Sequence, residues 1–358
     1  MILQSTTRAA SVSSRWVRSA LWVFTNLIWT FSLLAQEAVP KSENNSLPPE
    51  REKALRLQVF LDRAKFGPGK IDGRNGDFTL RALELYREAN GLPAPAASQN
   101  AEENKNPVVT DLDLTSVEPL YIEYTVTEAD VESVGPLPDK VPEQAKLKSM
   151  PYRSVGEAIA EKFHSDLKFF EELNPDKSGK LKAGDTVTVP NVKPFELSTV
   201  QDLDPGSELI GEDSTDKKVD DASHVFSVKV STKTNMLSVY QNEKLIAAYP
   251  VTIGSNQTES PVGDWKVSGV AKMPDFRYDK AMLERGERSD DFYILPSGPN
   301  NPVGVIWIQL NKKGIGLHGT SAPDTIGRSE SHGCVRLANW DVIRLAEKVK
   351  VGVAVEIQ

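Results

Sequence analysis

Two short segments near the C-terminus combine residue types that could perform nucleophilic chemistry. The first contains His318 and Gly319, and the second contains His332, Gly333 and Cys334. A thiol with a solution pKa of about 8.5 is mostly protonated at neutral pH, so it needs a base or a nearby positive charge to become a nucleophile. Flanking glycines would let backbone N–H groups approach the oxyanion that forms when a thiolate attacks a carbonyl. The two segments together predict a Cys–His site for acyl transfer.

Most residues around this thiol also have a structural explanation. His332 could polarise the site or only hydrogen-bond its own loop. Arg336 could shape the pocket, although a buried guanidinium more often pairs with a carboxylate inside its domain. Thr320 and Ser331 could line the pocket or cap loops. A lone cysteine before a helix is itself more often inert than reactive, so the prediction depends on the combination.

A zinc site is the rival chemical interpretation of the same residues. Catalytic zinc accepts three protein ligands, which here would be His318, His332 and Cys334. However, a His-x-Cys spacing with glycine between the ligands suits a single ion poorly. We therefore expect no metal and no other cofactor.

Composition narrows the class of protein. The chain has 358 residues, a net charge of -8 and one cysteine. This length suits two or three modules, and the negative charge argues against nucleic acid, which requires clustered cations. A single cysteine excludes an internal disulfide. In an oxidising compartment such a thiol is a liability unless it has a chemical task.

Residues 1–35 have the layout of a secretory signal peptide. Three arginines precede an uncharged stretch at 20–34, which ends at Ala35. The stretch is shorter than the roughly 20 apolar residues that a spanning helix needs. We expect cleavage and export to the periplasm or cell envelope, with membrane contact only if the segment is retained.

After a flexible tether at 36–50, residues 51–92 predict a small helical unit. Two helices flank a glycine-rich turn, and Thr79 is the expected cap of the second helix. The Leu-Gln opening, the Ile-Asp-Gly turn and the Thr-x-x-Ala-Leu helix start resemble the peptidoglycan-binding domain. The resemblance implies a wall-docking role, and the alternative is a helical hairpin that only packs on the rest of the protein.

A second small module follows the linker at 93–119. Residues 120–192 predict strand, helix, helix and strand, and AEKFHSDLKFFEELNP and LKAGDTVTVP are similar to a LysM module. That resemblance implies binding of N-acetylglucosamine chains, although 127–153 is an insertion. His164, between the two helices, is expected to be a surface or packing histidine. An acidic linker at 193–222 completes this half.

The C-terminal domain, 223–358, has the alternating hydrophobic pattern of strands. A meander of hairpins begins at Phe226, further strands are expected at 263–270 and 303–310, and residues 275–300 form a long irregular excursion. One helix, 339–350, precedes a last strand. The predicted class is an all-β domain with one or two helices, either a sandwich or a partly closed barrel.

The two reactive segments of this domain resemble a known signature. His-Gly-Thr at 318–320 and Ser-His-Gly-Cys-Val-Arg-Leu at 331–337 are similar to the L,D-transpeptidase (YkuD-type) catalytic domain, as are LSVYQNEKLIAAYPVTIG and TESPVGDWKV. The resemblance implies that Cys334 is the nucleophile and His318 the general base. It also implies that the Gly319 carbonyl orients His318, and that N–H groups of Gly333 and Cys334 form an oxyanion hole. The residues left to shape and polarise the pocket are Thr320, Ser331, His332 and Arg336.

The resemblance also implies a substrate, the peptidoglycan of the cell wall. The thiolate would attack the carbonyl between the third residue of a stem tetrapeptide donor and its terminal D-alanine. Transfer to an amine acceptor on a second stem would form a cross-link. The same acyl-enzyme would serve an L,D-carboxypeptidase or an enzyme that anchors proteins to the wall. An alternative of another class is an inactive scaffold that binds glycan strands through its N-terminal modules.

Overall fold

The computed structural model describes residues 47–94, 107–177, 180–197, 225–254, 262–312, 314–328 and 333–358. The predicted signal peptide, most of the tether and most of the acidic linker lie outside the described residues, and so do Ser331 and His332. Within these ranges, no helix has the length and hydrophobicity needed to span a membrane.

The N-terminal unit consists of α1 (Pro49–Arg63) and α2 (Asp77–Ala89). The predicted cap at Thr79 is wrong, because α2 begins after Gly76 and the threonine lies inside its first turn. Its buried hydroxyl instead donates to the Pro68 carbonyl at 3.4 Å and accepts from the Gln58 amide at 3.4 Å. Thr79 therefore joins the helix to the loop before it.

The turn between these helices is built around Gln58. Its side-chain oxygen accepts from the backbone N–H groups of Asp72 and Gly73 at 3.1 and 2.8 Å. Its amide nitrogen donates to the Asp72 carboxylate at 3.0 Å and to the Arg74 carbonyl at 2.9 Å. Gly73 has φ +70°, a conformation that favours glycine. The Leu-Gln and Ile-Asp-Gly motifs therefore have a folding role in this turn.

The second module has the predicted order of strand, helix, helix and strand. Strand β1 (Tyr121–Thr125) pairs antiparallel with β2 (Thr186–Pro190), and α6 (Val155–Lys162) and α7 (Leu167–Leu173) pack against them. Its apolar residues share one core with α1. The remaining short helices of this half are η1 (Leu114–Val117), α4 (Glu128–Glu132) and α5 (Val141–Gln144).

His164 is a packing residue and not a surface one. It is 1% exposed, its Nδ1 lies 2.9 Å from Asp62 Oδ2, and its ring stacks on Trp340 with centroids 5.4 Å apart. Sequence reasoning found no partner because Asp62 is 102 residues away. Burial lowers the pKa of His164, so we expect a neutral ring that donates to the carboxylate.

The C-terminal domain is built on one eight-stranded sheet, ordered β11-β10-β9-β6-β12-β3-β4-β5. Beyond β5 the chain returns to the opposite edge, where Thr252 and Arg336 exchange two backbone hydrogen bonds of 2.9 Å. The sheet therefore curls and closes in part, which fits the predicted partly closed barrel and not the sandwich. The strands are β3 (Phe226–Ser231), β4 (Met236–Gln241), β5 (Lys244–Pro250), β6 (Gly263–Lys272), β9 (Ile306–Leu310), β10 (Gly316–His318), β11 (Val335–Arg336) and β12 (Ala354–Ile357).

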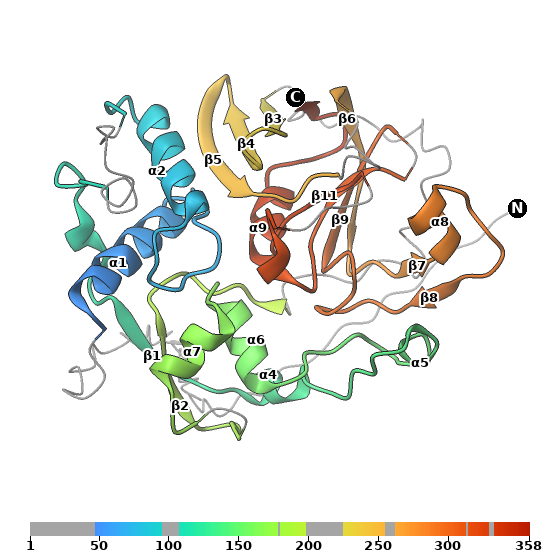
Figure 1. Cartoon of the computed structure of the whole chain (residues 1–358), viewed down its shortest axis with the longest axis horizontal. Coiled ribbons are helices and arrows are strands. Elements are labelled where there is room, and N and C mark those ends of the chain that lie inside the picture. The colour runs from blue at the N-terminus through green and yellow to red at the C-terminus, as the bar shows by residue number, and fades with distance from the viewer. Residues whose placement is uncertain are drawn as a thin grey trace, which may run out of the picture. The chain divides into compact units, whose positions relative to one another are not determined.

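One helix, α9 (Asn339–Ala346), packs against the concave side of this sheet (Figure 1). Its Val342 and Leu345 join the core that contains Leu317 and Val335 of the two edge strands. Leu317 of β10 and Val335 of β11 therefore point toward the core beneath α9. Because successive strand residues point to opposite faces, His318 and Arg336 face away from this core.

The excursion at 275–300 is ordered and not irregular. It forms a hairpin of β7 (Phe276–Tyr278) and β8 (Tyr293–Leu295) that encloses α8 (Lys280–Arg285). Asp279 holds it together by accepting from the N–H groups of Met282 and Ser289 at 3.1 and 2.7 Å. A short 3-10 helix, η5 (Pro323–Thr325), follows β10.

Candidate active site

Three residues of neighbouring strands form a row on the outer face of the sheet. Trp307 of β9 pairs with His318 of β10, and His318 pairs with Arg336 of β11. The rings of Trp307 and His318 stack with centroids 5.3 Å apart and an interplanar angle of 21°. The sheet register thus places an imidazole between an indole and a guanidinium.

Cys334 lies directly before β11 and next to this row. Val335 pairs with Leu317 in the core, so Cys334 and Arg336 share the face that carries His318. Its side chain packs against the cluster containing Trp307 and donates to the Gly314 carbonyl at 3.5 Å. Cys334 thus directly precedes the strand that pairs with β10, and the structure places the predicted thiol and imidazole on the same face of the sheet.

The hydrogen bond of His318 fixes which nitrogen carries its proton. Nδ1 lies 2.6 Å from the Gly319 carbonyl oxygen, which can only accept. Nδ1 therefore donates, and the lone pair of a neutral ring is on Nε2. Burial, together with the charge of Arg336, lowers the pKa of His318 to about 4 despite its bond to Gly319. The imidazole is consequently neutral at neutral pH and can accept a proton.

Arg336 is electrostatically coupled to the thiol. Burial lowers the pKa of Arg336, and interaction with the neighbouring Cys334 raises it. By reciprocity, the guanidinium charge favours the thiolate form of Cys334. Arg336 therefore supplies a positive charge near the thiol, as the sequence predicts for a reactive cysteine.

The remaining predicted residues have distinct positions. Gly333, directly before Cys334, is buried and has φ +100°, a backbone conformation that favours glycine. Thr320 is 3% exposed and its hydroxyl accepts from the Ala322 N–H at 3.2 Å, so it caps its loop. Ser331 and His332 lie outside the described residues, and the structure says nothing of their roles.

Two residues of this region were missed by sequence reasoning. Trp307 covers His318, and Asn339 fills the space behind Gly319, where a Cβ atom would come within 2.2 Å of the Asn339 amide oxygen. An aromatic residue in a predicted strand was the only available signal for Trp307. Nothing in the local sequence distinguishes Asn339 from an ordinary helix start.

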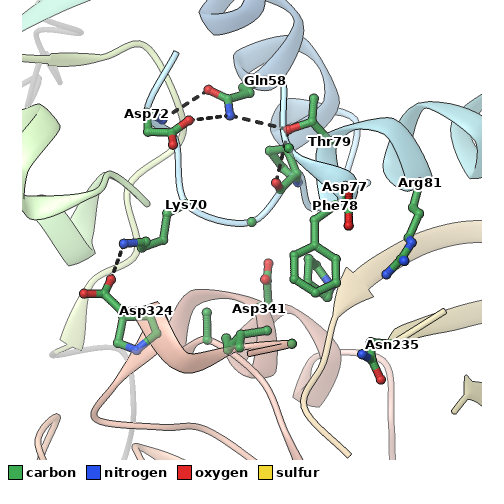
Figure 2. Close-up of a pocket in the computed structure, with 18 of the residues that line it drawn as sticks. Gln58, Lys70, Asp72, Asp77, Phe78, Thr79, Arg81, Asn235, Asp324 and Asp341 are labelled. Atoms are coloured by element: carbon green, nitrogen blue, oxygen red, sulfur yellow. Dashed lines mark hydrogen bonds and ion pairs between the residues drawn. The ribbon is translucent and has the colours of Figure 1, made fainter. Parts of the chain in front are cut away.

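A cavity of about 440 Å³ lies elsewhere, between the N-terminal helices and the C-terminal domain. Figure 2 shows Gln58, Asp72 and Thr79 hydrogen-bonded along one side, with Asp324 and Asp341 on the other. None of the predicted catalytic residues lines it. We therefore place the candidate active site at the row of Trp307, His318 and Arg336.

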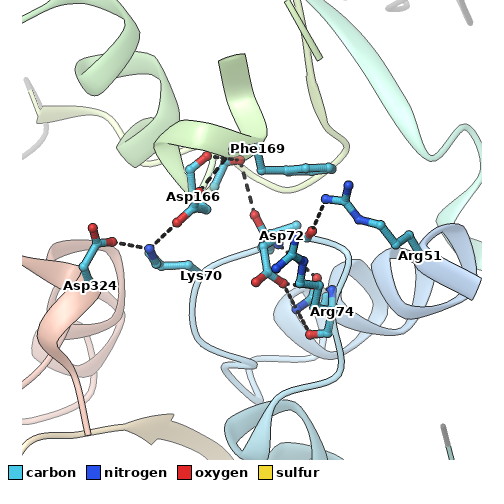
Figure 3. A network of polar contacts seen from close by, with 10 residues as sticks. Arg51, Lys70, Asp72, Arg74, Asp166, Phe169 and Asp324 are labelled. Carbon is cyan, nitrogen blue, oxygen red and sulfur yellow. Dashed lines mark hydrogen bonds and ion pairs between the residues drawn. The ribbon is translucent and has the colours of Figure 1, made fainter. Parts of the chain in front are cut away.

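The rim of this cavity is an ion-pair junction. Lys70 contacts the carboxylates of Asp166 and Asp324, which come from the second module and the C-terminal domain (Figure 3). Nearby, Arg51 donates to the Asp72 carbonyl at 2.9 Å. These contacts join the modules. Several polar groups at the cavity are therefore already bonded to other residues of the protein.

Comparison with known proteins identifies the family. The family model described as the L,D-transpeptidase catalytic domain (YkuD) matches residues 226–357. The L,D-transpeptidase YqjB of Bacillus subtilis strain 168 is 32% identical over 135 residues, which cover 36% of this chain and 69% of that protein. The chain belongs to the L,D-transpeptidase family. The enzyme class predicted from the two reactive segments is therefore confirmed.

Two further similarities cover different shares of the chain. The YkuD protein of Bacillus licheniformis is 25% identical over 202 residues, or 56% of this chain and 92% of that protein. Among solved structures, L,D-transpeptidase 3 of Mycobacterium tuberculosis is 18% identical, covers 37% of this chain and 61% of that chain, and has a TM-score of 0.32. The family assignment depends on the family model and the sequence relatives.

A metal site can be examined only in part. Among the residues that the structure describes, no group of three or more His, Cys, Asp or Glu side chains could hold a metal ion. The zinc alternative includes His332, which lies outside that set.

Proposed function

We propose that this L,D-transpeptidase cross-links peptidoglycan stem peptides through a thioester on Cys334. The observation that carries the proposal is the common face of the thiol, a neutral imidazole and a guanidinium. Nε2 of His318 accepts the thiol proton, and the sulfur attacks the carbonyl before the terminal D-alanine. The carbon–nitrogen bond breaks, and the D-alanine amine leaves with the proton from His318.

The second step reverses the direction of proton transfer. An amine of a second stem attacks the thioester and gives its proton to His318; the carbon–sulfur bond breaks, and the leaving sulfur of Cys334 takes that proton. N–H groups of Gly333 and Cys334 would stabilise the oxyanion in both steps, as the left-handed Gly333 supports. The Gly319 carbonyl occupies the position that a carboxylate takes in a Ser-His-Asp triad. Ser331 and His332 would complete the pocket.

We also propose that the N-terminal modules dock the enzyme on the wall. The resemblance of 51–92 to a peptidoglycan-binding domain and of 120–192 to a LysM module supports binding of glycan strands. The signal-like segment at 1–35 supports export to the periplasm or cell envelope. Both suggestions place the enzyme beside its substrate.

Muropeptide analysis tests the proposed function. Purified enzyme incubated with disaccharide tetrapeptides should release D-alanine and form cross-linked dimers. Release of D-alanine with tripeptides alone would identify a carboxypeptidase, and the absence of any product would favour the inactive scaffold. Activity that persists in EDTA would dismiss the zinc alternative, whereas activity lost in EDTA and restored by zinc would establish it.

The pH profile tests the role of His318. Because burial and Arg336 lower the pKa of this imidazole to about 4, it stays neutral until the pH falls through that value. The acidic limb of the acylation rate should thus lie near pH 4, whereas an ordinary histidine would place it near 6.5. The measurement is the rate at which imipenem adds to the protein between pH 3.5 and 7.5, followed by mass spectrometry.

Circular dichroism at each pH is the control, since acid unfolding would imitate a catalytic limb. A midpoint between pH 6 and 7 in protein that remains folded would contradict the assignment of a buried, neutral His318 as the base.

A further inference from the structure

A chain of contacts links the second N-terminal module to the carbonyl that holds His318. Glu161 of α6 accepts a hydrogen bond of 2.7 Å from the side-chain nitrogen of Asn339, at the start of α9. The two residues are 178 positions apart in sequence. The contact therefore exists only because α6 packs against α9.

The amide of Asn339 has a definite partner for each of its polar atoms. Its nitrogen also donates to the Pro299 carbonyl at 3.2 Å, and its oxygen accepts from the Val305 N–H at 3.2 Å. Asn339 is 0% exposed. With both hydrogens and the oxygen engaged, the side chain has one orientation.

The oxygen of this amide packs directly on the backbone behind the catalytic face. A Cβ atom on Gly304 or Gly319 would approach it to 2.1 or 2.2 Å, so both positions admit only glycine. The Gly319 carbonyl in turn accepts from His318 Nδ1 at 2.6 Å. A shift of the Asn339 amide would therefore move the group that orients the imidazole.

Glu161 is itself held firmly. The residue is 8% exposed, its carboxyl group is hydrogen-bonded to Tyr152, and burial raises its pKa to about 8. The preceding segment is bound to the same loop that contacts Asn339, since the Met150 N–H donates to the Ser297 carbonyl at 2.8 Å and the Asn300 side chain donates to the Pro151 carbonyl at 2.8 Å. The module is thus anchored on both sides of Pro299.

We propose that Glu161 is a positioning residue of the transpeptidase site: by holding Asn339 it fixes Gly319, and Gly319 fixes His318. The N-terminal module then serves the chemistry directly, in addition to any docking on the wall. This inference rests on the proposed function, because it concerns the orientation of the proposed base.

A matched pair of substitutions tests the role. Glu161→Leu keeps most of the volume but cannot accept from Asn339, whereas Glu161→Gln keeps the acceptor and resembles the protonated carboxyl group. A misplaced catalytic group costs up to about 100-fold in rate. We expect Glu161→Leu to lower the first-order acylation rate at saturating imipenem by about 10- to 100-fold, with little change in the half-saturating concentration. Glu161→Gln should stay within about threefold of wild type.

A spectroscopic readout separates positioning from general stability. In ¹H–¹⁵N spectra of the histidine side chains, assigned with a His318→Gln variant, wild type and Glu161→Gln should show His318 protonated on Nδ1. Folded Glu161→Leu should show a mixture of tautomers. If Glu161→Leu does not fold, Glu161→Met makes the same test, because its more flexible side chain also lacks an oxygen that could accept from Asn339.

The outcomes are distinguishable. If wild type takes up no imipenem, the proposed function fails. If wild type reacts and folded Glu161→Leu, or its substitute Glu161→Met, reacts equally fast with an unchanged His318 tautomer, only the positioning role is overturned. A slower rate that follows the unfolded fraction alone would overturn it as well.

Discussion

Replacing Cys334 with alanine should abolish covalent capture of a carbapenem. Imipenem should add one drug mass to the wild-type enzyme, because its strained lactam carbonyl acylates a thiolate as the donor stem does. The variant should gain no mass, and its turnover of muropeptides should fall by about 10⁴-fold or more, since no other group can form the thioester. Intact-mass spectrometry, with peptide mapping of the adduct, measures the result.

The structure makes this a clean experiment. Cys334 is the only cysteine, so no second thiol can substitute for it. Its side chain is partly exposed at the edge of the cluster around Trp307, and its removal leaves the main core intact. Cys334→Ser, which keeps the size and a weaker nucleophile, is the matched control for folding. Equal labelling of wild type and Cys334→Ala would refute the nucleophile.

The reactive segments were predictable because acyl transfer demands particular residue types close together in sequence. Gly333 precedes Cys334 directly, and Gly319 follows His318 directly, so local spacing contains much of the site. The local sequence did not reveal that Trp307, His318 and Arg336 lie side by side on three neighbouring strands. The pairing of His318 with both other residues depends on the order of the strands in the sheet. In particular, hydrophobic alternation along the chain does not indicate that β10 pairs in parallel with β11.

Residues that act over long separations were also beyond local reasoning. Glu161 looks like an ordinary charged residue in an amphipathic helix. Its partner Asn339 lies 178 positions away, and buried polar groups take whichever partner the packing supplies. For the same reason the local sequence did not reveal that His164 contacts Asp62, 102 positions away.

Replacing Asp62, which contacts Arg344 and His164, should strongly lower the stability of the protein. This carboxylate is fully buried in α1, accepts two hydrogen bonds of 3.0 and 2.9 Å from Arg344 of α9, and contacts His164. Burial alone would raise its pKa, but Arg344 and His164 hold that pKa well below its usual range. Asp62→Asn would keep the shape and remove the charge. We expect it to lower the free energy of unfolding by about 3 kcal/mol, because it leaves the Arg344 cation, 18% exposed, without its carboxylate.

The measurement is urea unfolding at pH 6. In the wild type, burial and the charge of Asp62 raise the pKa of the adjacent Asp341 to about 8, so Asp62 is the carboxylate that carries the charge beside Arg344 at this pH. Exposed Asp139→Asn is the matched control, with an expected change within about 0.5 kcal/mol. Adding Arg344→Met to Asp62→Asn should restore part of the loss, because the stranded cation is then removed. A loss below about 1 kcal/mol, or strictly additive losses in the double variant, would mean that the ion pair does not hold α1 against the catalytic domain.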